Sequence, residues 1–233
     1  MKKSLLLGIA IALVFAVNAN ASLIRLGNGS FTPAASVITF SETGYPINTV
    51  NPVYNAGGIN ITFDGYFVGG LGTPTVGQPL ALDAASADTF ITTDGANPTS
   101  PVLSGTPRFN GSIAILFSQN VAAVGLDGGY FDNIASMSIG AYDRLGNFLG
   151  AVTNTQTGIE FFGLGDNSGN AVIAGIQFYI SGYEAAGYAI DNLTFALDGG
   201  GYDPPNGVPE PASLLLIGLG LIGIAGLRKK IRK

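Results

Sequence analysis

Cysteine, histidine and tryptophan are absent from the 233 residues of the chain. Without cysteine the chain has no disulfide framework and no thiolate chemistry. Without histidine or cysteine the Ser-His and Cys-His nucleophilic systems are excluded, and a catalytic zinc site is disfavoured. A carboxylate pair for glycoside hydrolysis, drawn from Glu42, Glu160 or Glu184 with an aspartate, stays formally open, but no spacing favours one. We therefore expect a protein that is not an enzyme.

Basic residues are scarce in residues 22–211, which contain only Arg25, Arg108 and Arg144. All fifteen acidic residues of the chain fall in the same segment, so three positive and fifteen negative charges leave a net charge of −12 there. Because such a surface repels phosphate backbones, we do not expect nucleic acid as a partner. It suits divalent cations, or simply solubility outside the cell.

Sustained helical periodicity is lacking except at the two ends of the chain. At the N-terminus two lysines precede an apolar run over residues 4–17, and Ala19 and Ala21 fit the small-residue pattern of a cleavage site. We predict a signal peptide over residues 1–21, so that Ser22 begins the mature protein. An uncleaved N-terminal anchor is the alternative.

A proline-rich tetrad lies near the C-terminus and consists of Val208, Pro209, Glu210 and Pro211. Its prolines cannot continue a helix or a sheet, so we expect it to be extended and accessible. Residues 212–227 then form a run of 16 residues without a charge. As a helix this run would span roughly 24 Å, a little less than the ~30 Å hydrocarbon core of a bilayer. We predict a transmembrane helix here.

Five basic residues follow the apolar run: Arg228, Lys229, Lys230, Arg232 and Lys233. An excess of Lys and Arg stays on the cytoplasmic side of a membrane, so we expect the body of the protein outside and its last residue inside. Composition alone also fits an ordinary C-terminal anchor that remains in the membrane.

The order of these three features, tetrad, Gly/Leu-rich run and basic terminus, resembles the PEP-CTERM sorting signal, which also carries the label of an ice-binding protein C-terminal domain. The resemblance covers about residues 207–233. It implies recognition of the tetrad by an exosortase, a membrane cysteine protease of Gram-negative bacteria. It further implies anchoring in the inner membrane before processing, removal of the helix, and transfer of the body to the cell surface or the extracellular polysaccharide matrix. It assigns no function to the body.

The body, residues 22–198, shows short β-branched or aromatic runs separated by turn signals. This pattern predicts an all-β protein with a single jelly-roll-like β-sandwich. A Gly/Pro linker over residues 199–207 would join it to the sorting signal, residues 208–233. The expected strands lie at 36–40, 58–63, 66–68, 89–92, 112–117, 121–126, 135–142, 148–153, 158–162, 172–180 and 188–197.

Several short elements of the body, from Ile-Thr-Phe-Ser-Glu42 to Ala-Ile-Asp191-Asn192-Leu193, are similar to jelly-roll domains found ahead of PEP-CTERM signals and to jelly-roll carbohydrate-binding modules. In such modules an acid of the last strand and an acid near the first hold a structural calcium ion. The resemblance places these roles on Asp191 and Glu42, and the Asp- and Asn-rich body offers oxygen ligands. Alternatively, Asp191 caps a strand end and Glu42 faces solvent.

A second acidic cluster, Asp127-Gly-Gly-Tyr130-Phe131-Asp132-Asn133, is predicted to form a loop between two strands. Aromatic rings stack on sugar rings while carboxylates and amides bond hydroxyl groups, so this loop could bind a sugar or calcium. A plain hairpin turn with its aromatic side chains folded into the sheet is the alternative.

Two functions compete for the body. The first is a non-catalytic module that binds extracellular polysaccharide and is stabilised by calcium, which predicts an exposed aromatic patch near Tyr130 and Phe131. The second is a structural surface or matrix protein without a small ligand, which predicts self-association instead.

Overall fold

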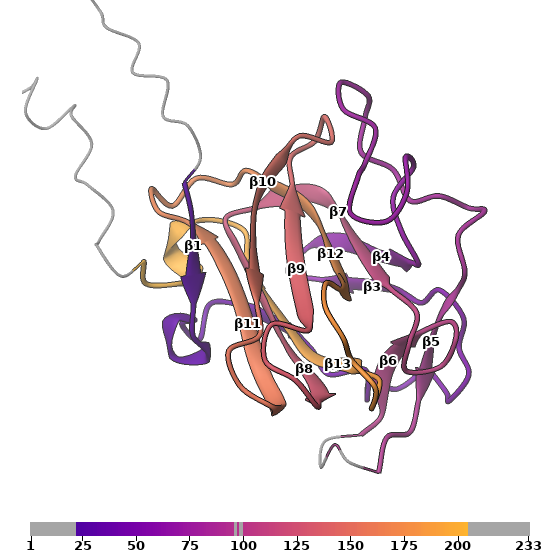
Figure 1. Ribbon diagram of the computed structural model, residues 1–233. Helices are drawn as coiled ribbons and strands as arrows, with labels where there is room; N and C mark the ends of the chain where they lie inside the picture. The colour runs from indigo at the N-terminus through magenta and orange to yellow at the C-terminus, as the bar shows by residue number, and fades with distance from the viewer. Residues whose placement is uncertain (1–21, 96, 98–99, 205–233) are drawn as a thin grey trace, which may run out of the picture.

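Two antiparallel β-sheets make up the computed structural model, which describes residues 22–95, 97 and 100–204 (Figure 1). Helix in this part is confined to two short 3-10 turns, η1 (Asn28–Ser30) and η2 (Gly199–Gly201). The all-β class expected from the sequence is therefore confirmed, and the arrangement is consistent with a jelly-roll-like domain.

The first sheet contains seven strands, six of them in the order β1-β11-β8-β13-β6-β5, with β2 paired to β13. Its edges are β1 and β5, and β8 and β13 lie at its centre. The strands are β1 (Leu23–Leu26), β2 (Ser36–Ile38), β5 (Thr89–Thr92), β6 (Val102–Gly105), β8 (Ala123–Phe131), β11 (Gly158–Asp166) and β13 (Ala189–Ala196).

The second sheet contains six strands in the order β10-β9-β12-β7-β4-β3. Its strands are β3 (Val53–Ala56), β4 (Ile59–Asp64), β7 (Ile113–Val121), β9 (Met137–Tyr142), β10 (Phe148–Thr153) and β12 (Ile173–Ile180). Every strand pair in both sheets is antiparallel.

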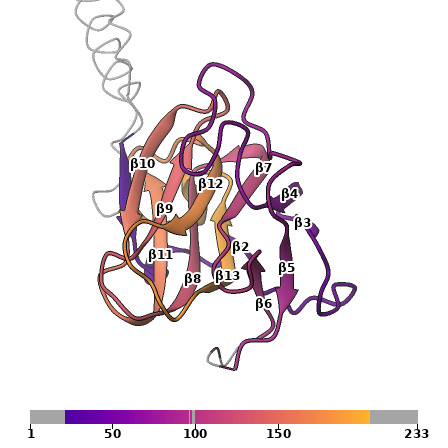
Figure 2. The same cartoon turned by 45° about the vertical axis from the view of Figure 1, so that its right-hand side comes forward.

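The core lies between the two sheets, which face each other in both views (Figures 1 and 2). Residues of β8 and β11 that alternate toward the second sheet, such as Leu126 and Phe162, are fully buried. Aromatic rings bridge the two layers: the centroids of Phe162 and Phe178 are 5.4 Å apart, and those of Phe117 and Phe195 are 5.5 Å apart. Such ring pairs add specific contacts to the burial of apolar area.

Some strands differ from the sequence-based expectation. The strands at Thr89–Thr92 and Phe148–Thr153 occur with the expected bounds, whereas β1, β3 and β6 were not predicted. The strand expected at 66–68 is wrong, because Phe67 forms only an isolated bridge to Leu82.

The folded body continues past residue 198, where the sequence predicted a linker to begin. Thr32 N donates to Gly201 O, Phe31 pairs with Tyr202, and Tyr202 itself is 1% exposed. The Tyr202 hydroxyl donates to Asp166 O, and burial together with the nearby Asp166 carboxylate raises the pKa of Tyr202 to about 12. This tyrosine therefore fixes the end of the body to the turn that follows β11.

The predicted signal peptide, the last three residues of the predicted linker (205–207) and the whole predicted sorting signal lie outside the described residues. The described part of the chain holds no helix of the length and apolar character that crossing a membrane requires. The transmembrane helix expected at 212–227 thus stays a sequence-based prediction.

Candidate functional site

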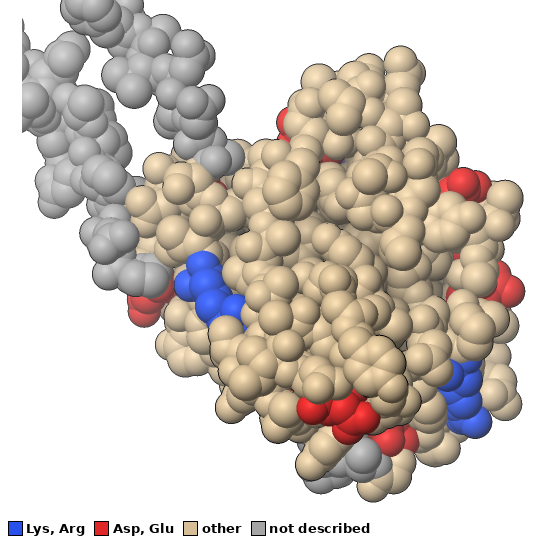
Figure 3. Space-filling view, viewed as in Figure 1, with Lys and Arg blue, Asp and Glu red and all other residues tan. Residues whose placement is uncertain are grey.

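Basic side chains occupy only two small patches on the face shown in Figure 3, one beside β1 and one beside β5 and β6. Two of the three arginines of the body are engaged internally. Arg25 forms an ion pair with Glu160 and donates to Thr153 O. Arg144 donates to Phe117 O and to Asn120 Oδ1, and burial lowers its pKa.

Arg108 differs from the other two arginines. It is exposed and its guanidinium carbon lies 5.4 Å from the ring centroid of Phe109 and 6.0 Å from that of Phe90. Among the described residues it has no hydrogen bond or ion pair. Stacking on two rings holds the guanidinium plane while leaving its N–H edge open to a ligand.

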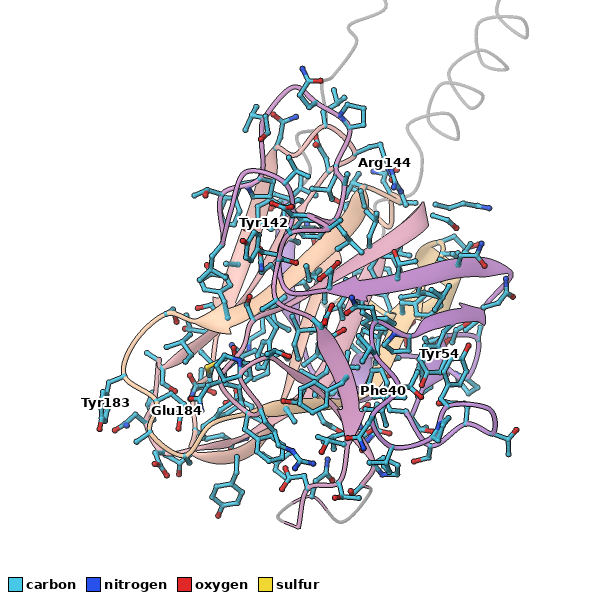
Figure 4. The ribbon with its side chains drawn as sticks, turned by 90° about the vertical axis from the view of Figure 1, so that its right-hand side faces the viewer. Phe40, Tyr54, Tyr142, Arg144, Tyr183 and Glu184 are labelled. Atoms are coloured by element: carbon cyan, nitrogen blue, oxygen red, sulfur yellow. The ribbon has the colours of Figure 1, made fainter. Side chains whose placement is uncertain are left out.

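Several carboxylates hold the loops around them. Glu184, which is 8% exposed, accepts hydrogen bonds from Asp132 N, Ser136 Oγ and Ala186 N. It thereby joins the loop after β8 to the loop before β13. In Figure 4 the neighbouring Tyr183 points away from the body, while Glu184 turns toward it.

Glu160, in β11, likewise holds a turn with its carboxylate, here the turn between β10 and β11. It is 4% exposed and accepts from Thr155 N, Thr155 Oγ1 and Gln156 N besides Arg25. The carboxylates of Glu160 and Glu184 are therefore each occupied by several donors.

The predicted acidic loop is displaced from its expected place. Asp127 lies in the middle of β8, where its Oδ2 accepts from Asn192 Nδ2 at 2.8 Å, so the loop starts only at Asp132. Asp127 and Asp191 are paired across β8 and β13. Asp191 is fully buried and accepts from Asn192 N and Asn97 Nδ2.

The prediction that Phe131 is exposed and contacts a ligand is wrong. It is 0% exposed and packs edge-on against Phe162 and close to Phe178, so it belongs to the core. Its neighbour Tyr130 is 51% exposed. Because successive side chains of a strand point to opposite faces, the two aromatic residues could not both lie on the surface.

The rings of Phe40 and Tyr54, both labelled in Figure 4, pack edge-on, and Glu42 lies beside the Tyr54 hydroxyl. Its Oε1 accepts from Thr39 N and Thr39 Oγ1, while its Oε2 is buried and has no hydrogen-bond partner. The expected pairing of Glu42 with Asp191 would need further ligands. Within the described ranges, no group of three or more acidic, histidine or cysteine side chains could hold a metal ion.

Tyr130 lines a pocket of about 240 Å³ at one end of the first sheet. The pocket forms where the end of β5, the turn after β6, the end of β8 and the start of β13 meet. Its lining residues are Asp94, Phe109, Gly129, Tyr130, Ala186, Gly187 and Tyr188. It combines aromatic walls with one carboxylate side chain, the mixture that positions a polar ligand with an apolar face.

The walls of this pocket are fixed by backbone contacts. Tyr188 N donates to Phe109 O at 2.6 Å, which joins the turn after β6 to the strand β13. Gly187 has a φ of +85°, and a Cβ there would lie 2.4 Å from Phe109 O, so only glycine allows this approach. Burial raises the pKa of Tyr188, which keeps its hydroxyl protonated.

Sequence reasoning found Tyr130 but missed Asp94, Phe109 and Tyr188. These residues lie far apart along the chain and no local pattern connects them.

A second pocket of about 260 Å³ lies within the loop after β4 and offers no charged or aromatic group; its lining residues are Val68, Pro74, Thr75, Gln78, Pro79, Leu80 and Ala81.

The described residues thus define a two-sheet antiparallel β-sandwich with an aromatic-walled pocket, which holds one carboxylate side chain, at the end of one sheet. Beyond it, residues 207–230 match the family model of the PEP-CTERM protein-sorting motif. The chain therefore carries a PEP-CTERM sorting motif, as its tail predicted. This motif implies export, anchoring in a membrane before processing, and processing by an exosortase, which is a membrane protein.

Comparison with curated proteins found no match. Among solved structures, the chain is similar to the enzymatically active domain of tailspike protein 4 of bacteriophage CBA120, at 16% sequence identity and a TM-score of 0.26. The similarity covers 69% of this chain and 21% of the tailspike chain. The chain thus spans about a fifth of that protein, and so slight a likeness defines neither fold nor function.

Proposed function

We propose that this protein is a surface or matrix protein of a Gram-negative bacterium whose body binds extracellular polysaccharide without catalysis. The sorting motif supports the route to the cell surface. The observation that carries the binding function is the pocket beside the exposed ring of Tyr130.

The chemistry of this pocket suits a sugar. The exposed Tyr130 ring can pack against the C–H face of a pyranose, and the Asp94 carboxylate can accept hydrogen bonds from hydroxyl groups. At about 240 Å³ the pocket is smaller than the roughly 300–1,000 Å³ of typical small-molecule sites. It therefore suits one residue or one end of a polymer rather than a large compact ligand.

A non-catalytic role is supported by how the candidate acids are used. Glycoside hydrolysis needs two carboxyl groups free to act on substrate. Glu160 and Glu184 instead accept hydrogen bonds from their own loops.

The binding function predicts that Tyr130→Ala weakens polysaccharide binding by about 5- to 30-fold, because loss of one stacking ring removes on the order of 1–2 kcal/mol. The full chain in detergent micelles would be titrated with neutral and acidic soluble polysaccharides by calorimetry. Tyr183→Ala is the matched control, since Tyr183 is 76% exposed but does not line the pocket. Equal affinity in wild type and Tyr130→Ala, or no binding of any polysaccharide, would contradict the proposal.

A structural calcium ion at Glu42 and Asp191 belongs to the same proposal. Its support is Glu42 Oε2, a buried carboxylate oxygen with the Tyr54 hydroxyl as its polar neighbour. Since the described residues do not assemble three acids, carbonyl and amide oxygens would have to complete the six to eight ligands that calcium prefers.

Calcium bound only to the folded state raises the melting temperature. At a hundredfold excess over Kd the gain is ~2.7 kcal/mol, or about 5–10 °C for a domain of this size. We expect this rise for the full chain and for Asp132→Asn, whose side chain is exposed, but not for Glu42→Gln. No calcium-dependent rise in the wild type would exclude the calcium site.

A further inference from the structure

We propose that the Tyr130 pocket selects an acidic sugar residue, such as a uronate, whose carboxylate pairs with Arg108. This inference rests on the proposed polysaccharide-binding function and specifies its ligand.

The first support is the availability of Arg108. Arg25 is paired with Glu160, and Arg144 is bonded to Phe117 O and Asn120. Within the described residues Arg108 is thus the one arginine whose N–H groups make no internal hydrogen bond. An exposed guanidinium with open donors is suited to bidentate recognition of a carboxylate.

The second support is its position at the pocket. Arg108 lies over the ring of Phe109, and Phe109 is a wall of the pocket. The same turn is held against Tyr188, another wall, by the hydrogen bond from Tyr188 N to Phe109 O. Arg108 does not itself line the pocket, but it lies against one of its walls, on a turn that the Tyr188–Phe109 hydrogen bond fixes in place.

Together these groups match the parts of a uronate residue. Tyr130 offers a ring for the sugar face, Asp94 an acceptor for hydroxyl groups, and Arg108 a cation for the carboxylate. A neutral sugar would contact Tyr130 and Asp94 but would offer no carboxylate to Arg108.

The net charge of −12 over residues 22–211 opposes an anionic polymer only at short range, because charges more than a Debye length apart, about 8 Å at physiological salt, are largely screened. The groups at the pocket then decide the local preference. They include a single carboxylate side chain, that of Asp94.

The test compares polygalacturonate with its fully methyl-esterified form, which keeps the sugar backbone and removes the charge. Binding to the full chain in detergent micelles is measured by calorimetry at physiological salt, with EDTA present so that calcium cannot bridge polymer and protein. A charge-assisted hydrogen bond is worth about a tenfold change in affinity or more. We expect the acid to bind at least that much more tightly than the ester, and Arg108→Gln to abolish this difference without changing affinity for the ester.

Asn28→Asp is the matched control, because it changes the net charge by the same amount as Arg108→Gln but lies in η1, beside the edge strand β1. It should keep the preference for the acid. Equal binding of acid and ester to the wild type would overturn the inference and leave the proposed function standing. So would a preference that survives in Arg108→Gln. Failure of both polymers, and of neutral polysaccharides, to bind would instead overturn the proposed function.

Discussion

Glu184 illustrates how this acidic protein uses its carboxylates. It accepts from two backbone N–H groups and one hydroxyl group. Two of these donors belong to the loop after β8, and the third belongs to the loop before β13, in which Glu184 itself lies. Asp143 accepts from Leu145 N and Asn147 N, and Asp166 from Ser168 N and Asn170 N, in the same manner. Around Glu184, where the donors are partly or fully buried, the carboxylate satisfies groups that water would not easily reach, whereas the turn at Asp143 is more exposed.

Replacement of Glu184 by alanine should destabilise the fold by about 2–4 kcal/mol, since each buried donor left without an acceptor costs about 1–3 kcal/mol and some will find water. Urea unfolding of the full chain, followed by far-ultraviolet circular dichroism, measures the change. Asp132→Asn, in the loop after β8 to which Glu184 bonds and with an exposed side chain, should alter stability by less than about 0.5 kcal/mol. A loss for Glu184→Ala no larger than that of the control would show that the loops do not depend on this carboxylate.

The pair Tyr130 and Phe131 shows what sequence reasoning resolved at the level of single residues. Composition and neighbours predicted aromatic side chains beside acids, and Tyr130 is indeed exposed at a pocket with Asp94. The error for Phe131 arose because the strand was predicted to end at Leu126, whereas β8 continues to Phe131. Once the strand is extended, alternation sends Phe131 into the core.

Among the elements, strands with clear alternation were predictable, and the short edge strand β5 was also found, whereas the short edge strands β1 and β3 were not. Ile59, Ile61 and Phe63 alternate with polar residues, and β4 is present with these three side chains buried. The strand β3 has only four residues and β1 likewise, and each pairs with a single neighbour at a sheet edge. Whether such short segments form strands depends on the partner strand rather than on their own alternation of apolar and polar residues. The sequence alone therefore did not indicate them.

The pocket was beyond local sequence analysis for a related reason. It takes residues from the ends of four separate elements, and the antiparallel pairing of β13 with β8 and β6 brings these ends together. Asp94 and Phe109 come from segments that lie between the predicted strands. Only the order of the strands in the sheet makes them neighbours of Tyr130.

For the whole molecule, the two ends of the described chain lie beside β1, the edge strand of the first sheet (Figures 1 and 2). Near the start of the described chain Asn167 N donates to Ser22 O, and near its end Asp203 N donates to Ser30 O, the last residue of η1. Val208 follows Pro204 by four residues, which can span at most about 14 Å. Before processing, the β1 edge is thus held close to the sorting motif, while β5 lies five strand spacings, roughly 24 Å, across the sheet.

This arrangement predicts that the anchored protein turns its β1 edge toward the membrane and its β5 edge away from it. The chain has no cysteine, so single-cysteine variants can each carry one fluorophore. Asn28→Cys marks the β1 side, and Ile47→Cys marks the β5 side, since Ile47 is 40% exposed and Asn48 N donates to Ile91 O of β5. In vesicles containing the full chain and lipids with spin-labelled headgroups, the fluorophore at residue 28 should be quenched clearly more than that at residue 47. The difference should vanish in detergent. Equal quenching in the vesicles would mean that the short connection does not orient the body, because the sandwich would then be free to tumble about its attachment.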